Sequence, residues 1–228
     1  MATVVRSFAI QGIDGYPVDI EIKMLEGQPS ISIIGLGDQA VKEAAERIQA
    51  AIDESGYVFP KKRVIISLAP SDKKKSGSHF DLAMAVGVLC QNGDIGVKKL
   101  PDYGFIGELS LDGRLRACRG ILPMIIAGQK RGIKKIIVPE ANFKEASLVH
   151  GVEILGFYDL IGVVRYLEGK TTGIETHMEV NEKILEESER ILDFKDVKGQ
   201  DKLIEAVVLA AAGGHNMLMV GEPGCGKT

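Results

Sequence analysis

A chain of 228 residues is long enough for one large domain, or for one domain and part of a second. Its composition, 45% hydrophobic and 26% charged, is typical of a globular protein with a sizeable core, and its net charge of −3 excludes a global basic field for nucleic acid while leaving a local basic patch possible. No apolar run approaches the ~20 residues that a membrane span needs and no signal peptide is visible, so we expect a cytoplasmic protein without membrane contact.

The cysteines and histidines indicate neither a disulfide nor a zinc site. Cys90, Cys118 and Cys225 have no paired spacing and form no CxxC motif, and the four histidines are scattered.

The first third of the chain predicts strands followed by a helix. Residues 18–24 alternate apolar and charged side chains, which is the period of a half-buried strand, and residues 8–10 and 31–33 suggest two further strands. Apolar residues then recur at helical spacing over residues 40–52, with Asp38 as the N-cap and Gly56 as the stop.

The middle of the chain alternates helices and strands. We expect strands at residues 64–68, 105–109, 135–138 and 152–155, helices at 82–90, 121–130, 143–149 and 160–167, and a β-hairpin over 107–116. Strands first, then alternating helices and strands, predict a mixed sheet with helices packed on it, which is the α+β class.

The composition changes after Glu168, which predicts three segments: a domain over residues 1–168, an acidic linker over 169–190, and the start of a second domain over 191–228. In the third segment, residues 203–211 predict a helix that ends at Gly213-Gly214, and Met217 to Val220 predict a strand.

That strand would lead into a phosphate-binding loop. Its residues match G-x-x-x-x-G-K-[ST] and are Gly221, Glu222, Pro223, Gly224, Cys225, Gly226, Lys227 and Thr228. Glycine-rich turns aim backbone N–H groups at a phosphate chain, Lys227 would bridge the β- and γ-phosphates of ATP, and the Thr228 hydroxyl would hold Mg²⁺.

Half of the electrostatic field that holds the phosphates in such a loop comes from the N-terminus of the helix that follows it. The sequence stops before any such helix. We therefore expect a piece of a longer ATPase, cut just inside its nucleotide domain. This piece alone should neither hydrolyse ATP nor bind it tightly, and its residues beyond about 190 should be poorly packed.

Two other glycine motifs give weaker signals. Gly169-Lys170-Thr171 lacks the first glycine of the phosphate loop, because Val164 stands at that position. The run from Gly35 to Ala40 matches G-x-G-x-x-G/A, but the acidic residues that follow it fall at the end of the same predicted helix, so a tight strand-to-helix turn is the better interpretation.

The loop over residues 69–79 combines serines, Lys73 to Lys75 and His79. It could supply a Ser-Lys or Ser-His nucleophile, or a small basic patch for a phosphate backbone. We favour a solvated loop before the next helix over catalysis, because these lysines are expected to be exposed, and leave backbone binding open.

Several motifs resemble the ComM/YifB family of magnesium-chelatase-like AAA+ ATPases, over essentially the whole chain. The stretches that carry the resemblance are residues 12–15, 34–38 with 41–43, 67–70 with 80–82, 107–109, 193–194, 197–200 and 210–216. The resemblance implies an N-terminal domain of the ribosomal-S5-like fold shared with the Lon protease domain, followed by an AAA+ motor that forms hexamers. It also implies ATP-driven action on DNA in branch migration and natural transformation. At residues 72–76 the chain departs from the family, with three lysines and Ser76 replacing a Leu-Pro-Lys-Glu run.

Two other functions remain open for the N-terminal domain. It could be a module that organises the ring without a ligand of its own. It could also be a Lon-like serine peptidase using Ser76 or Ser78. The peptidase is disfavoured because the lysine that such enzymes carry in the helix after the Gly-Glu-Leu hairpin is missing from residues 121–125, and the next lysine is Lys130.

Overall fold

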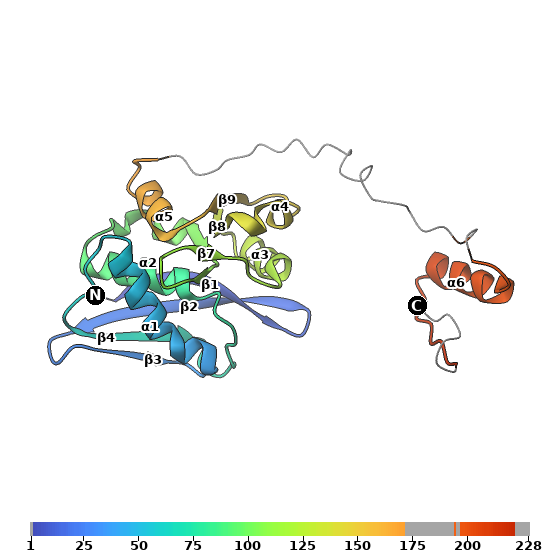
Figure 1. Ribbon diagram of the computed structural model, residues 1–228, viewed down its shortest axis with the longest axis horizontal. Helices are drawn as coiled ribbons and strands as arrows, with labels where there is room; N and C mark the ends of the chain where they lie inside the picture. Colours follow the sequence, from blue (N-terminus) through green and yellow to red (C-terminus); the bar gives the residue numbers. More distant parts are fainter. Residues whose placement is uncertain (1, 172–193, 195–196, 222–228) are drawn as a thin grey trace. The chain divides into compact units, whose positions relative to one another are not determined.

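The computed structural model describes residues 2–171, 194 and 197–221. The chain divides into two compact units, Met1–His177 and Met178–Thr228, and each is described by itself. The first unit contains a seven-stranded mixed sheet with the strand order β3-β4-β2-β1-β5-β8-β9 (Figure 1). The strands are β1 (Thr3–Gln11), β2 (Asp14–Leu25), β3 (Ser30–Ile34), β4 (Arg63–Ala69), β5 (Tyr103–Phe105), β8 (Lys135–Pro139) and β9 (Glu153–Phe157).

Helices cover both faces of the sheet and create two cores. On one face lie α1 (Gln39–Glu54), α2 (Asp81–Asn92) and α5 (Leu160–Leu167), which pack on strands that include β1, β2 and β4. On the other face lie α3 (Ile121–Lys130) and α4 (Phe143–Ala146), which enclose a smaller core around Phe8, Ile136 and Val138. Short 3₁₀ turns, η1 (Val97–Asp102) and η2 (Glu140–Asn142), connect these elements.

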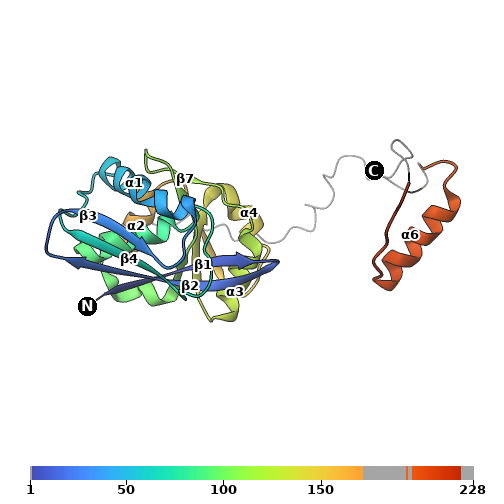
Figure 2. The same cartoon turned by 90° about the horizontal axis from the view of Figure 1, so that it is seen from below.

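The hairpin of β1 and β2 forms the centre of the sheet and passes against α3 (Figure 2). Its register runs from Thr3 opposite Ile22 to Gln11 opposite Asp14, with a two-residue turn between the strands. At Gly15 the backbone of α3 approaches so closely that a Cβ atom there would lie 2.0 Å from the carbonyl oxygen of Pro123. Glycine is therefore required at this contact.

The chain leaves the sheet between residues 105 and 108, so the single strand predicted over 105–109 is wrong. β5 ends at Phe105, and the N–H of Gly107 donates to the carbonyl of His79 instead of to a strand. A separate hairpin then forms from β6 (Glu108–Leu109) and β7 (Leu115–Arg116). β5 is three residues long and pairs with β1 at a single position, Arg6 opposite Gly104.

A buried ion pair joins α1 to the first turn of α2. Arg47 Nε and Nη2 lie 2.7 and 3.1 Å from the two carboxylate oxygens of Asp81, which has no exposed side-chain area. Asp81 also accepts from the N–H of Leu109 at 3.3 Å, and Arg47 donates to the carbonyl of Ala40 at 2.8 Å. Burial raises the pKa of Asp81 to about 6, although its bond to Arg47 acts in the opposite direction.

The second unit is described over one helix, α6 (Asp201–Gly213), which ends at Gly214 in the left-handed conformation. None of its residues is buried, which confirms the expectation of poor packing for the described part of this segment. The predicted strand at Met217 to Val220 is wrong. Residues 215–220 have no regular structure, and Leu218 and Val220 are 86% and 88% exposed. A strand needs a hydrogen-bonded neighbour, and none pairs with this segment among the described residues.

The predicted α+β class, a mixed sheet with packed helices, is confirmed. The local signals were accurate where they were strong: Asp38 caps α1 by accepting from the N–H of Val41, and α3 and α5 have the predicted bounds. In the described part of the chain, no helix is long and apolar enough to cross a membrane.

Replacing Arg47 by methionine should lower the free energy of unfolding by about 3–5 kcal/mol at pH 7, because the buried carboxylate of Asp81 would lose its partner. Since Arg47 lowers the pKa of Asp81, that pKa should lie above about 6 in the variant, so the loss should shrink as the pH falls toward about 6 and the carboxyl group becomes protonated. Urea unfolding at pH 7 and pH 5 measures both effects.

The matched control is Arg131→Met, at an exposed arginine just after α3, which should change stability by less than about 0.5 kcal/mol. An equal effect of the two substitutions at pH 7 would contradict a structural role for the Arg47 ion pair.

Candidate functional site

The predicted phosphate loop falls almost entirely outside the described residues. Of its eight positions only Gly221 is described, and it is exposed; Glu222 to Thr228, including Lys227 and Thr228, are outside. The loop therefore stays a prediction from sequence. The other Gly-Lys-Thr, at residues 169–171, is described, and Lys170 there pairs with Glu168 at 3.0 Å in an exposed position.

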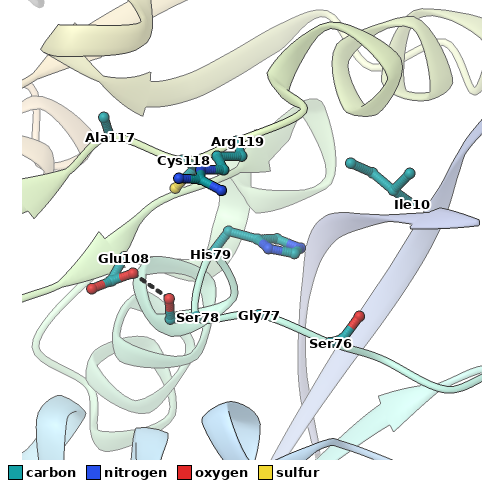
Figure 3. Close-up of a pocket in the computed structure, with 9 residues that line it drawn as sticks. All are labelled: Ile10, Ser76, Gly77, Ser78, His79, Glu108, Ala117, Cys118 and Arg119. Carbon is teal, nitrogen blue, oxygen red and sulfur yellow. Dashed lines mark hydrogen bonds between the residues drawn. The ribbon is translucent and has the colours of Figure 1, made fainter. Parts of the chain in front are cut away.

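The first unit contains a polar pocket of about 430 Å³ where the N-terminus of α2, the end of β1 and the β6–β7 hairpin meet. In Figure 3, Cys118 and Arg119 lie on one side of it, Ser76, Gly77 and Ser78 lie on the other, and His79 lies between them. Its lining residues are Ile10, Ser76, Gly77, Ser78, His79, Glu108, Ala117, Cys118 and Arg119. This volume is within the ~300–1,000 Å³ range of ligand pockets.

Glu108 is the carboxylate of the pocket, and protein groups already bind it. It accepts a short hydrogen bond from the hydroxyl of Ser78 (Figure 3), and Arg116 lies 3.6 Å from its other oxygen. Arg119, by contrast, has no ion pair or hydrogen bond within the described residues. The pocket therefore contains one carboxylate, Glu108, that is already bound by protein groups, and one guanidinium, Arg119, that has no partner within the described residues.

His79 is held as a neutral side chain. Burial lowers the pKa of its imidazole, outweighing the hydrogen bond to Phe8 and the charge of Asp38. Its Nε2 lies 2.9 Å from the carbonyl oxygen of Phe8, which requires the ring proton to be on Nε2. His79 is thus a link between the pocket and β1.

Segment 117–119 is fixed in place by the side chain of Asn142. The N–H of Cys118 donates to Asn142 Oδ1 at 2.7 Å, and Asn142 Nδ2 donates to the carbonyl of Cys118 at 2.9 Å. Burial raises the pKa of the Cys118 thiol to about 12, so it stays protonated and is a poor nucleophile at neutral pH.

The expectation that all three lysines of the 69–79 loop are exposed is wrong. Lys75 is fully buried, and its amine donates a short hydrogen bond to the carbonyl of Pro70. Burial lowers the pKa of Lys75, against the opposing charge of Asp72. Its neighbour Lys73 lies over the ring of Tyr16 at 4.6 Å. The loop is therefore anchored to the β1–β2 hairpin.

This geometry gives a peptidase no activated serine. A desolvated lysine is what a Ser-Lys dyad needs, but Lys75 bonds a carbonyl and does not line the pocket. Ser78 bonds a carboxylate, and Lys130 is exposed at the far end of α3. Among the described residues, no lysine lines the pocket beside Ser76 or Ser78.

The run from Gly35 to Ala40 is the predicted tight turn. It joins β3 to α1, and a Cβ atom on Gly35 would lie 2.3 Å from the carbonyl oxygen of Leu68. Close backbone packing therefore explains why position 35 is a glycine, and nucleotide binding is not needed to explain it. In the described part of the chain, no group of three or more potential metal-ligating side chains comes together.

Sequence reasoning found the loop 76–79 but missed most of its partners. Glu108 was noticed only as part of a hairpin, and neither Arg119 nor Asn142 was singled out. The separations explain this: Ser78 and Glu108 are 30 residues apart, and Cys118 and Asn142 are 24 apart. No local pattern connects them.

Two family models match the chain. The model described as subunit ChlI of Mg-chelatase matches residues 20–142, and the model described as magnesium chelatase, subunit ChlI, matches residues 193–228. The second match includes the predicted phosphate loop.

Similar curated proteins support the same assignment. The chain is 36% identical to the uncharacterised protein YifB of Escherichia coli over 228 residues, and 34% identical to the competence protein ComM of Haemophilus influenzae over 226 residues. Each alignment covers 99% of this chain and 44% of the relative, so the chain spans less than half the length of these relatives.

A more distant similarity covers about three fifths of the chain. The Lon protease of Rhizobium meliloti is 26% identical over 149 residues, which is 62% of this chain and 18% of that protein. The family models and the near-complete alignments agree: the chain belongs to the ComM/YifB family of magnesium-chelatase-like AAA+ proteins.

Proposed function

We propose that this chain carries the phosphate-binding loop of an ATP-driven AAA+ motor that acts on DNA. The observation that carries the proposal is the loop Gly221 to Thr228, which contains G-x-x-x-x-G-K-T inside the segment matched by the magnesium-chelatase model. In such loops the backbone N–H groups surround the phosphates.

Each end of the loop has its own role in the proposal. Lys227 would neutralise charge on the β- and γ-phosphates, and the hydroxyl of Thr228 would hold the Mg²⁺ that accompanies ATP. The bound nucleotide would supply the free energy that drives movement on DNA. The remaining loop residues, Gly221 to Gly226, would contribute backbone groups rather than side chains.

The relative named a competence protein favours DNA as the substrate, because competence is the capacity to take up DNA. Action in branch migration or recombination, self-association into a hexameric ring and a cytoplasmic location complete the proposal. They are supported by the family assignment.

A second role for the first unit is assembly of the ring without a ligand of its own. The net charge of −3 and the mixed charges around the 69–79 loop favour it. Direct DNA binding by this unit requires exposed cations, of which Lys74 is one. The salt dependence of DNA binding separates the two.

In the full gene product, Lys227→Ala should reduce ATP hydrolysis by at least ~100-fold, because the charge on the transferred phosphoryl group loses its neutralising cation. The matched control is Lys170→Ala, which changes the exposed lysine of the other Gly-Lys-Thr and should leave hydrolysis unaltered. Equal rates of ATP hydrolysis by the Lys227 variant and the unaltered protein would disprove the proposal that this loop serves an ATP-driven motor.

If the first unit contacts DNA, the logarithm of the affinity of residues 1–228 for branched DNA should fall linearly with the logarithm of salt concentration, with a slope of about −0.9 for each phosphate neutralised. Lys73→Glu with Lys74→Glu should weaken binding and flatten the slope. Fluorescence anisotropy between 50 and 300 mM salt measures both. A slope of zero would assign the unit to assembly instead.

A further inference from the structure

The outer edge of β1 is open at Ile10. In an antiparallel pair, successive residues direct their backbone groups alternately toward the partner strand and away from it. Gln11 closes the two-residue hairpin with Asp14, and the carbonyl of Phe8 accepts from His79. The backbone groups of Phe8 and Ile10 therefore point away from β2.

Nothing in the described chain continues the sheet beside Ile10. β5 pairs with β1 only at Arg6 and ends at Phe105, and no described hydrogen bond reaches the outward N–H or C=O of Ile10. Ile10 lines the pocket. The pocket thus occupies the place that a longer neighbouring strand would fill.

The opposite walls also present unpaired backbone. Lys75 exchanges both backbone hydrogen bonds with Leu36 and Asp38, so the next residue, Ser76, directs its own groups to the other side. Within the described residues, neither Ser76 nor Ala117 makes a backbone hydrogen bond. A ligand with alternating donors and acceptors would satisfy these groups, and an extended peptide has that pattern.

The charges of the pocket select the kind of peptide. Glu108 is already bonded by Ser78 and lies 3.6 Å from Arg116, whereas Arg119 has no partner within the described residues. The unmet charge is therefore positive, and a carboxylate can form a two-point contact with a guanidinium. A nucleic-acid strand fits less well, because its row of phosphates would meet one free cation and the carboxylate of Glu108.

We propose that the pocket binds an acidic, extended segment of a partner protein, which adds as a strand beside Ile10 of β1 and places a carboxylate on Arg119. The segment is bound and not cleaved, because among the described residues no lysine lines the pocket and no hydrogen bond joins His79 to Ser76 or Ser78. This role is independent of the ATP site and would give the first unit a ligand of its own.

The test uses a displayed library of random heptapeptides, selected on immobilised residues 1–228, with the selected peptides then synthesised. The selected peptides should carry Asp or Glu at a shared position and should bind with micromolar affinity. N-methylation of alternate backbone nitrogens should weaken binding at least tenfold, because it removes the donors that pair with β1. N-methylation of the intervening residues should weaken binding less, because that side of the peptide faces only the groups of Ser76 and Ala117.

Arg119→Glu should weaken the same peptides at least tenfold, whereas Arg131→Glu, an exposed arginine at the far end of α3, should not. Both positions are exposed, so folding is not at stake. The proposal is overturned if no peptide is selected, if binding ignores Arg119, or if every N-methylated form binds equally well.

Discussion

The length of β5 determines what the first unit can do. This strand has three residues and pairs with β1 only at Arg6, so β1 has a strand on both sides at that position and only β2 beside it from there to Gln11. Where the chain leaves the sheet at Gly107, it turns to the carbonyl of His79 and starts the β6–β7 hairpin. The polar pocket is the space that this departure leaves beside Ile10.

The surroundings of that space are rigid for identifiable reasons. The Arg47–Asp81 pair fastens α1 to the start of α2, and Asp81 in turn accepts from the N–H of Leu109 in the hairpin. On the other side Asn142 holds both backbone groups of Cys118. Three elements distant in sequence are thus fixed around one opening, which is the preorganisation that a binding site needs.

Local structure could be predicted from the sequence where a single short-range signal decides it. The polar side chain of Asp38 caps α1, and apolar spacing alone located α3 and α5. What could not be predicted depends on contacts across the chain. The burial of Lys75, the pairing of Arg47 with Asp81 and the strand order β3-β4-β2-β1-β5-β8-β9 have no local signature. The strand expected at Met217 to Val220 had the right side chains but has no pairing partner among the described residues.

The two units of the chain invite different questions. The second contains the sequence motif on which the proposed motor function rests, and the first contains a pocket that this proposal does not explain. The central claim about the first is that β1 is an open edge at Ile10. Amide hydrogen exchange of the free chain, resolved by residue, tests it directly. Ile10 should exchange at least ~100-fold faster than Ala9, whose N–H faces β2. Equal protection of the two amides would show that the edge is closed.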